Sequence, residues 1–198
     1  AIMTAFDNKN SRTAGADIEA MFTDRWSSKA FSDQTLKQEQ INSLFEAARW
    51  APSGNNRQPW LFVYSTSGPQ REKFDSLLSE GNAVYVPKAA MMVLVFARTF
   101  DDDGNRIRTA FFDTGAAWMS LALQANLMGL NTRALGGIDL DGAYEIANVP
   151  ADKYETVCGI AIGYPGTDAD LIPSLVQQNF ANDRKDISVV AYSDRYSP

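Results

Sequence analysis

The stretch Met91-Met92-Val93-Leu94-Val95-Phe96-Ala97 is apolar at every position. Val and Phe favour extended backbone, and a strand that is apolar on both faces is covered on both sides by other elements. We therefore predict that residues 91–97 form a central strand, and that the rest of the chain is arranged around it.

Helices and further strands are predicted outward from this strand. Apolar residues recur at helical spacing over residues 17–24, 37–50, 70–78 and 108–128, and the last of these segments is apolar on all sides and ends at Gly129. β-rich runs occupy residues 60–64 and 157–162, and a weaker β-like stretch covers residues 187–192. We predict a single α+β domain over residues 1–198, with a central mixed β-sheet flanked by helices.

Each end of the chain carries only one short periodic segment. Residues 1–24 are expected to be an N-terminal extension and residues 167–198 a polar C-terminal tail. A tail too polar to fold alone, together with an all-round apolar helix, needs a partner surface. We therefore expect a homodimer in which the tail wraps the partner subunit.

Composition excludes several classes of function. Lys and Arg number 18 against 24 Asp and Glu, so the net charge of -6 gives no broad attraction to nucleic acid or to an anionic membrane. The chain has no histidine, which excludes a Ser-His-Asp or Cys-His catalytic site and any His-ligated metal, and we expect no metal site. Cys158 is the single cysteine, so no intrachain disulfide can form.

The location of the protein is predicted from the same features. No apolar stretch reaches the ~20 residues that cross a bilayer, and the first eleven residues lack the order of a signal peptide. A lone cysteine also fits a reducing compartment. We expect a cytoplasmic protein.

Two short segments carry the chemistry. Arg25-Trp26-Ser27-Ser28-Lys29-Ala30-Phe31 combines two cations and two hydroxyls with an aromatic residue, and a turn here would bring Arg25, Ser27 and Lys29 onto one anion. Ala51-Pro52-Ser53-Gly54-Asn55-Asn56-Arg57-Gln58-Pro59-Trp60 has the composition of a rigid loop that enters a strand. Each segment also has a plain interpretation, as a solvated basic face and as a tight helix-to-strand connection.

Taken in order, these segments resemble the FMN-dependent nitroreductase family. The resemblance runs from about Arg25 to about Val190 and continues through the following features: Asn82, Asp113-x-Gly115-x-Ala117, Gly129-Leu130, Gly136-Gly137-x-Asp139, Ile162-Gly163-Tyr164-Pro165 and Arg184-Lys185. It is specific in combination, since each element alone is a common pattern. The resemblance implies the nitroreductase-like fold, bound FMN as cofactor, and NAD(P)H as the electron-donating co-substrate.

The resemblance also implies a role for individual residues. Arg25, Ser27 and Arg184 match residues that hold the FMN phosphate and ribityl chain, and Lys29 and Asn82 match groups beside the pyrimidine edge of the flavin. Gly136 and Gly137, which follow Leu135, match backbone at the reactive side of the ring, so no side chain is expected to be catalytic. The cofactor-binding set is Arg25, Trp26, Ser27, Lys29, Pro52, Ser53, Gly54, Asn56, Asn82, Leu135, Gly136, Gly137 and Arg184.

The loop residues Pro52, Ser53, Gly54 and Asn56 match a loop that comes from the second subunit in the family. The chain departs from the family at Gly54, where many relatives have Ser, and at Asn182, where some place a second cation. Trp26 stands where a basic or polar residue is common.

The resemblance implies a ping-pong oxidoreductase that passes hydride from NAD(P)H to nitroaromatic, quinone or similar small electrophilic acceptors. One alternative within flavin chemistry stays open, a relative with another reductive role such as ene-reduction or dehalogenation. A second alternative, from a different class, is a non-catalytic module that binds FMN or another nucleotide for storage or sensing. A scaffold without flavin that uses Cys158 as a reactive thiol is less favoured, because Cys158 lies in an apolar strand.

Overall fold

The computed structural model describes residues 9–198 and contains a four-stranded sheet in the order β1-β2-β4-β3. The strands are β1 (Trp60–Ser65), β2 (Met91–Arg98), β3 (Asn131–Leu135) and β4 (Tyr154–Gly163). Each neighbouring pair runs antiparallel, with Leu94 opposite Val63 on one side and Gly159 on the other. β2 is therefore a central strand, as predicted from its composition.

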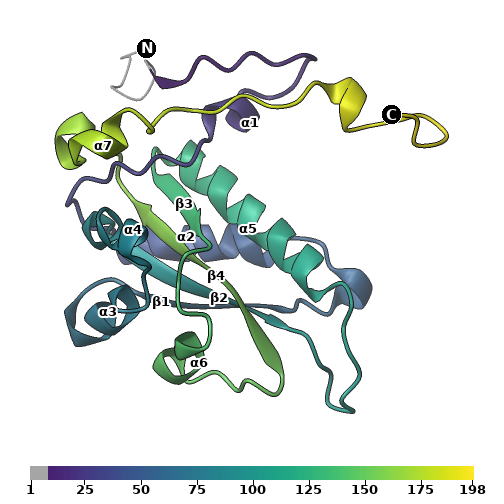
Figure 1. Ribbon diagram of the computed structural model, residues 1–198. Helices are drawn as coiled ribbons and strands as arrows, with labels where there is room; N and C mark the ends of the chain where they lie inside the picture. Colours follow the sequence, from purple (N-terminus) through teal and green to yellow (C-terminus); the bar gives the residue numbers. More distant parts are fainter. Residues whose placement is uncertain (1–8) are drawn as a thin grey trace.

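Helices cover both faces of this sheet (Figure 1). The α-helices are α1 (Met21–Asp24), α2 (Gln38–Arg49), α3 (Gly68–Asp75), α4 (Glu80–Ala83), α5 (Ala110–Leu127), α6 (Gly142–Ala147) and α7 (Pro173–Val176). Short 3-10 helices are η2 (Gly54–Asn56), η3 (Val86–Lys88), η4 (Asp168–Asp170) and η5 (Ile187–Val189). The described part of the chain thus has the α+β architecture expected from the sequence.

Alternation along β2 explains its uniformly apolar sequence. Met91, Val93 and Val95 pack with α2 and α5 on one face of the sheet, whereas Met92, Leu94 and Phe96 pack with α3 and α6 on the other. Since helices occupy both faces, neither set of side chains can be polar. The sequence predicted a mixed sheet, and that detail is wrong for the described strands, because coverage on both faces does not require parallel pairing.

Several predicted boundaries hold and others change. The helices predicted over residues 37–50 and 108–128 are confirmed as α2 and α5, within one and two residues at each end. The helix predicted over residues 17–24 shrinks to α1, and the one over residues 70–78 becomes α3, which begins at Gly68 because Pro69 fits the first turn of a helix. The strand predicted over residues 157–162 is longer at both ends.

The tail corrects another expectation. The β-like stretch over residues 187–192 contains the 3-10 helix η5, and Ile187, Val189 and Val190 are 54–66% exposed. No neighbouring strand lies beside it among residues 9–198, so its β-branched residues have nothing to pair with. Residues 1–8 of the expected N-terminal extension lie outside the described residues, as does most of the segment considered for a signal peptide.

The long helix α5 is apolar on all sides, but only one of its faces is buried. Ala117, Leu121 and Ala125 face the sheet and are buried, while Phe112 is 81% exposed. An apolar helix with one uncovered aromatic face is typical of a protein that associates with a second chain. In the part of the chain that the structure describes, no helix is both long enough and apolar enough to cross a bilayer.

Candidate functional site

Residues 25–31 run as an extended segment across one end of the sheet. Asn179, which is buried, accepts the Lys29 backbone N–H at 2.8 Å and donates to the Ser28 hydroxyl at 3.1 Å. Asn131 donates to the Ser28 carbonyl at 3.0 Å and to the Ala30 carbonyl at 3.3 Å. The buried side-chain amides of Asn131 and Asn179 thus keep this segment extended.

The extended backbone decides which side chains face outward. Ser28 and Ala30 are buried, whereas Ser27 and Lys29 are partly exposed and line a pocket together with Arg25. Successive side chains of an extended segment point to opposite sides, so the spacing Arg-x-Ser-x-Lys puts three polar groups on one side. The sequence suggested that a turn would bring them together. The structure achieves the same grouping by alternation.

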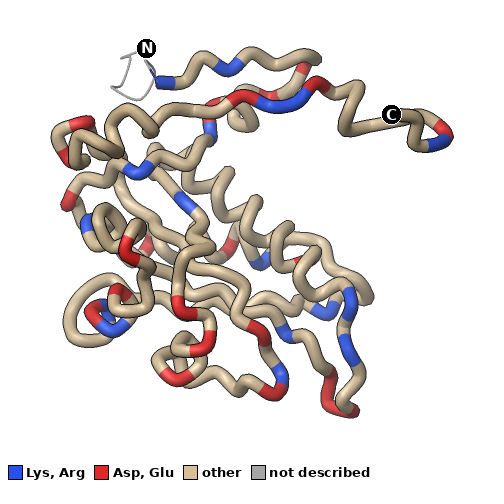
Figure 2. Tube along the Cα trace, viewed as in Figure 1, with Lys and Arg blue, Asp and Glu red and all other residues tan. Residues whose placement is uncertain are grey.

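This pocket has a volume of about 240 Å³ and is lined by five cations from four parts of the chain. We call it the cationic pocket, and its lining is Arg12, Arg25, Trp26, Ser27, Lys29, Arg133, Gln178, Asn179, Phe180, Ala181, Asn182 and Arg184. In Figure 2, basic positions of the N-terminal and C-terminal stretches lie on the same side of the molecule. An acidic chain of net charge -6 therefore concentrates positive charge at one place.

The electrostatics of the pocket favour an anion. Burial, followed by the repulsion of Arg184, lowers the pKa of Arg25, and burial and then Arg133 lower the pKa of Lys29. The Nε of Arg25 is buried and has no hydrogen-bond partner within the described residues 9–198. Cations whose pKa values are lowered by burial and by a neighbouring positive charge are stabilised by a bound anion with several acceptor oxygens, and guanidinium groups match the oxygen spacing of phosphate.

A hydrogen-bonded chain connects this pocket to Asn82 and Gly137. Arg133 donates from Nη1 to the Ser27 carbonyl at 2.5 Å and from Nε to the Tyr85 hydroxyl at 3.0 Å. That hydroxyl donates to Asn82 Oδ1 at 2.8 Å, and Asn82 Nδ2 donates to the Gly137 carbonyl at 3.0 Å. Burial raises the pKa of Tyr85, so the hydroxyl keeps the proton that it donates.

The two glycines after β3 differ in their surroundings. A Cβ added at Gly137 would lie 2.6 Å from Ser79 Oγ and 2.9 Å from Asn82 Nδ2, so only glycine lets these side chains approach the backbone. A Cβ at Gly136 would meet nothing within 4 Å, which leaves open space beside that peptide. Leu135 is 1% exposed in the core, so only its backbone can face a ligand.

The loop that carries Pro52, Ser53, Gly54 and Asn56 does not line the cationic pocket. The Gly54 N–H donates to Asp113 Oδ2 at 3.1 Å near the start of α5, and the Gln58 N–H donates to Ser53 Oγ at 3.0 Å. Asn55 and Asn56 have φ values of 52° and 53°, the left-handed conformation that asparagine tolerates. The hydrogen bond from Gly54 to Asp113 places this loop at the start of α5.

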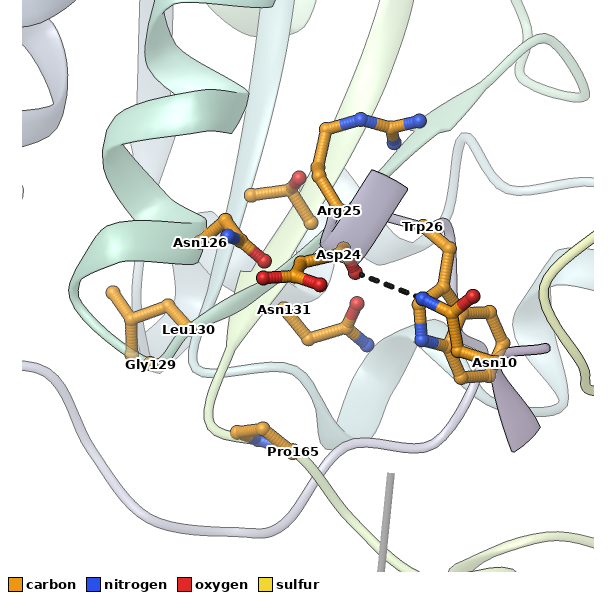
Figure 3. Close-up of a pocket in the computed structure, with 10 residues that line it drawn as sticks. Asn10, Asp24, Arg25, Trp26, Asn126, Gly129, Leu130, Asn131 and Pro165 are labelled. Atoms are coloured by element: carbon orange, nitrogen blue, oxygen red, sulfur yellow. Dashed lines mark hydrogen bonds between the residues drawn. The ribbon is translucent and has the colours of Figure 1, made fainter. Parts of the chain in front are cut away.

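A second, neighbouring pocket locates Arg25 relative to α5. This cavity of about 300 Å³ is lined by Asp24, Arg25, Asn126 and Gly129, among others, so it lies at the end of α5. In Figure 3 the Arg25 guanidinium extends away from the Asp24 carboxylate. Asp113 and Asn126 are separated by about 20 Å of helix at a rise of about 1.5 Å per residue. Arg25 and Gly54 of one chain therefore lie at opposite ends of α5.

Sequence reasoning missed four contributors to the site. Arg133 lies in β3, and this strand was not predicted because its residues mix polar and apolar types. Tyr85 and Asn179 do not belong to any recognised sequence motif. An arginine inside a short run before Gly136-Gly137 was the one signal that could have drawn attention to Arg133. Arg12 lies upstream of both recognised segments.

The fold and the site together define an α+β domain that has a cation-lined pocket at the end of an antiparallel sheet. Comparison with known proteins gives the family: the chain belongs to the nitroreductase family, whose model matches residues 22–94 and 82–164. It is 26% identical to the FMN reductase (NADPH) of Bacillus subtilis (strain 168) over 179 residues, which is 81% of this chain and 70% of that protein.

Solved structures agree with this assignment. The crystal structure of an oxidoreductase containing FMN is 33% identical, and it matches 98% of this chain and 99% of its own with a TM-score of 0.91. A nitroreductase family protein from Clostridium difficile 630, 20% identical, shares the fold with a TM-score of 0.67 over 87% of this chain and 95% of its own.

The buried hydrogen-bonded chain gives a first prediction. Tyr85→Phe removes the proton that Asn82 Oδ1 accepts and the oxygen that Arg133 Nε donates to, so we expect the free energy of unfolding to fall by about 1–3 kcal/mol. Urea denaturation monitored by circular dichroism measures it. Tyr64→Phe removes the same hydroxyl at a site that is 39% exposed and should change stability by less than about 0.5 kcal/mol. Equal losses in the two variants would contradict the network.

Proposed function

We propose that this protein is an FMN-dependent oxidoreductase that transfers hydride from NAD(P)H to small electrophilic acceptors such as nitroaromatics and quinones, by a ping-pong mechanism. The observation that carries the proposal is the cationic pocket, where Arg25, Ser27, Lys29 and Arg184 converge in an acidic chain. When bound, FMN supplies a ring that accepts and releases hydride at N5.

The residues present fit this cofactor. Arg25 and Arg184 would hold the phosphate through charge-assisted hydrogen bonds, and the buried Nε of Arg25, which has no hydrogen-bond partner among residues 9–198, would gain an acceptor. Lys29, which lines the same pocket, would supply positive charge to the pyrimidine edge of the flavin. The open space at Gly136 admits a flat ring against the backbone, and Asn82 is held at the same edge by Tyr85 and Gly137.

Proton transfer by a histidine is unavailable to this chain, so its residues act by binding and orientation. A backbone N–H does not titrate, and a hydrogen bond from Gly136 would orient the reactive edge without an acid or base. Cys158 takes no part, because burial raises the pKa of its thiol to about 11 and thus keeps it protonated.

The proposal includes a homodimer with one FMN at each interface. Within one chain the loop over residues 52–56 and the cationic pocket lie at opposite ends of α5. Two copies whose α5 helices cross antiparallel would place the loop of one chain at the pocket of the other. The exposed Phe112 of α5 and the exposed apolar residues Ile187, Val189 and Val190 of the tail supply surface for such contacts, with the tail wrapped around the partner.

Removal of the phosphate cations tests the binding site. Arg25→Ala and Arg184→Ala should each weaken FMN binding by one to two orders of magnitude, because each deletes a charge-assisted contact of about 1.5–3 kcal/mol. Fluorescence titration of apo-protein with FMN measures the affinity. Arg106→Ala, which removes the same charge from an arginine paired with Glu155 away from the pocket, is the matched control. Wild-type protein that fails to bind FMN would overturn the proposed function.

Lys29→Gln tests mechanism separately from binding. The phosphate cations remain, so we expect FMN affinity to be largely kept, but the midpoint potential of the bound flavin should fall. A loss of about 1.4 kcal/mol of preference for the reduced form corresponds to about 30 mV in a two-electron couple. Spectroelectrochemistry of both proteins decides the point. An unchanged potential in a variant that still takes up hydride from NADPH would remove Lys29 from the ring.

Sedimentation tests the dimer. The wild-type protein should sediment at twice the mass of the 21.8 kDa chain. Phe112→Glu, which puts charge on the exposed face of α5, should shift the equilibrium toward monomer and reduce FMN binding with it. Leu140→Glu changes an exposed apolar residue next to α6 and should remain dimeric. A wild-type monomer that retains FMN would contradict the shared site.

A further inference from the structure

The N-terminal segment before α1 is hydrogen-bonded to the two parts of the chain that carry Arg25 and Arg184. The Ala181 N–H donates to the Lys9 carbonyl at 2.8 Å, and Lys9 forms an ion pair with Asp168. Asn10 Nδ2 donates to the Thr23 carbonyl at 2.9 Å. Figure 1 shows this stretch running beside the C-terminal stretch above the sheet. The segment is thus attached to both neighbours by hydrogen bonds.

Arg12 is the residue of this segment that reaches the cationic pocket. Its Nη1 donates to the carbonyl of Arg25 at 2.7 Å, and its Nε donates to the carbonyl of Asn182 at 2.7 Å. Arg12 therefore bridges the backbone at Arg25 and the backbone two residues before Arg184. The planar guanidinium fixes the spacing of the two segments, which a lysine with one terminal nitrogen does less rigidly.

Arg12 also adds charge at the same place. Burial lowers the pKa of Arg12, and Arg184 and Arg25 lower it further, while Asp183 acts in the opposite direction. The Arg184 guanidinium donates hydrogen bonds to the backbone carbonyls of Asn182 and Asp183, which are neutral groups. None of the ion pairs recorded among residues 9–198 involves Arg12, Arg25 or Arg184. Three guanidinium groups thus share a pocket with no carboxylate paired to them.

We propose that Arg12 is a third arginine of the phosphate site, which sets the spacing of Arg25 and Arg184 and makes the pocket selective for a terminal phosphate dianion. The inference rests on the proposed function, since the phosphate is that of FMN. It assigns a binding role to the N-terminal segment, which lies outside the residues that the family model matches, and it predicts discrimination between FMN and riboflavin, which lacks the phosphate.

The test compares the two flavins. In Arg12→Gln we expect FMN affinity to fall about 10- to 100-fold, whereas riboflavin affinity should change less than about 3-fold, because the lost contacts act on the phosphate. Arg12→Lys keeps the charge but not the double bridge and should lie in between. Lys9→Gln removes the same charge and a neighbouring anchor from the same segment, and its FMN-to-riboflavin preference should equal that of the wild type.

Each outcome has a defined meaning. Equal losses for FMN and riboflavin in Arg12→Gln would show a purely structural role and overturn the inference, while the proposed function would stand. If circular dichroism shows that Arg12→Gln is unfolded, the ratio of FMN affinity to riboflavin affinity is measured on Arg12→Lys instead. If the wild type binds neither flavin, the proposed function fails; thermal stabilisation by inorganic phosphate then tests Arg12 alone, and equal stabilisation of wild type and Arg12→Lys would overturn its role.

Discussion

Two buried amide side chains, those of Asn131 and Asn179, hold residues 28–30 in an extended conformation, and the site depends on this constraint. A buried amide N–H that is left unpaired costs free energy, and the segment accepts hydrogen bonds from the Nδ2 of both asparagines, so it is fixed in position. Alternation along that segment then sends Ser28 and Ala30 into the core and leaves Ser27 and Lys29 at the surface of the pocket. The same bonds that stabilise the fold therefore arrange the functional groups.

The concentration of positive charge in this pocket runs against the composition of the whole chain. Burial of the Arg12 and Arg25 guanidinium groups, followed by repulsion from Arg184, lowers their pKa values, so their charged forms are disfavoured before any ligand binds. In the proposed site, a bound phosphate would offset both the burial and the repulsion. The apo-protein is accordingly expected to gain stability with the cofactor, because a ligand that binds only the folded state shifts the folding equilibrium by mass action.

Much of the fold could be predicted because its determinants are local. The two-sided apolar pattern of residues 91–97 and the helical spacing in α2 and α5 follow directly from burial, and Arg25, Ser27 and Lys29 form a recognisable pattern. β3 and the 3-10 helix η5 could not be predicted from local sequence. β3 is a strand because it pairs with β4, and the segment that contains η5 is not a strand because no other strand lies beside it among residues 9–198. Arg12, Arg133 and Asn179 act through contacts more than 100 residues away in sequence, or through carbonyl groups, which no local pattern encodes.

The length of α5 connects the fold to the proposed assembly. An 18-residue helix is about 27 Å long, so groups attached to its two ends cannot contact one small ligand within a single chain. The Gly54 loop is tied to the start of this helix through Asp113, and Arg25 lies near its end. Both segments can serve one cofactor only if a second copy brings its own loop to the first pocket. The exposed aromatic face of α5 is the surface on which that second copy would lie, so the dimer would complete the site as well as bury the helix.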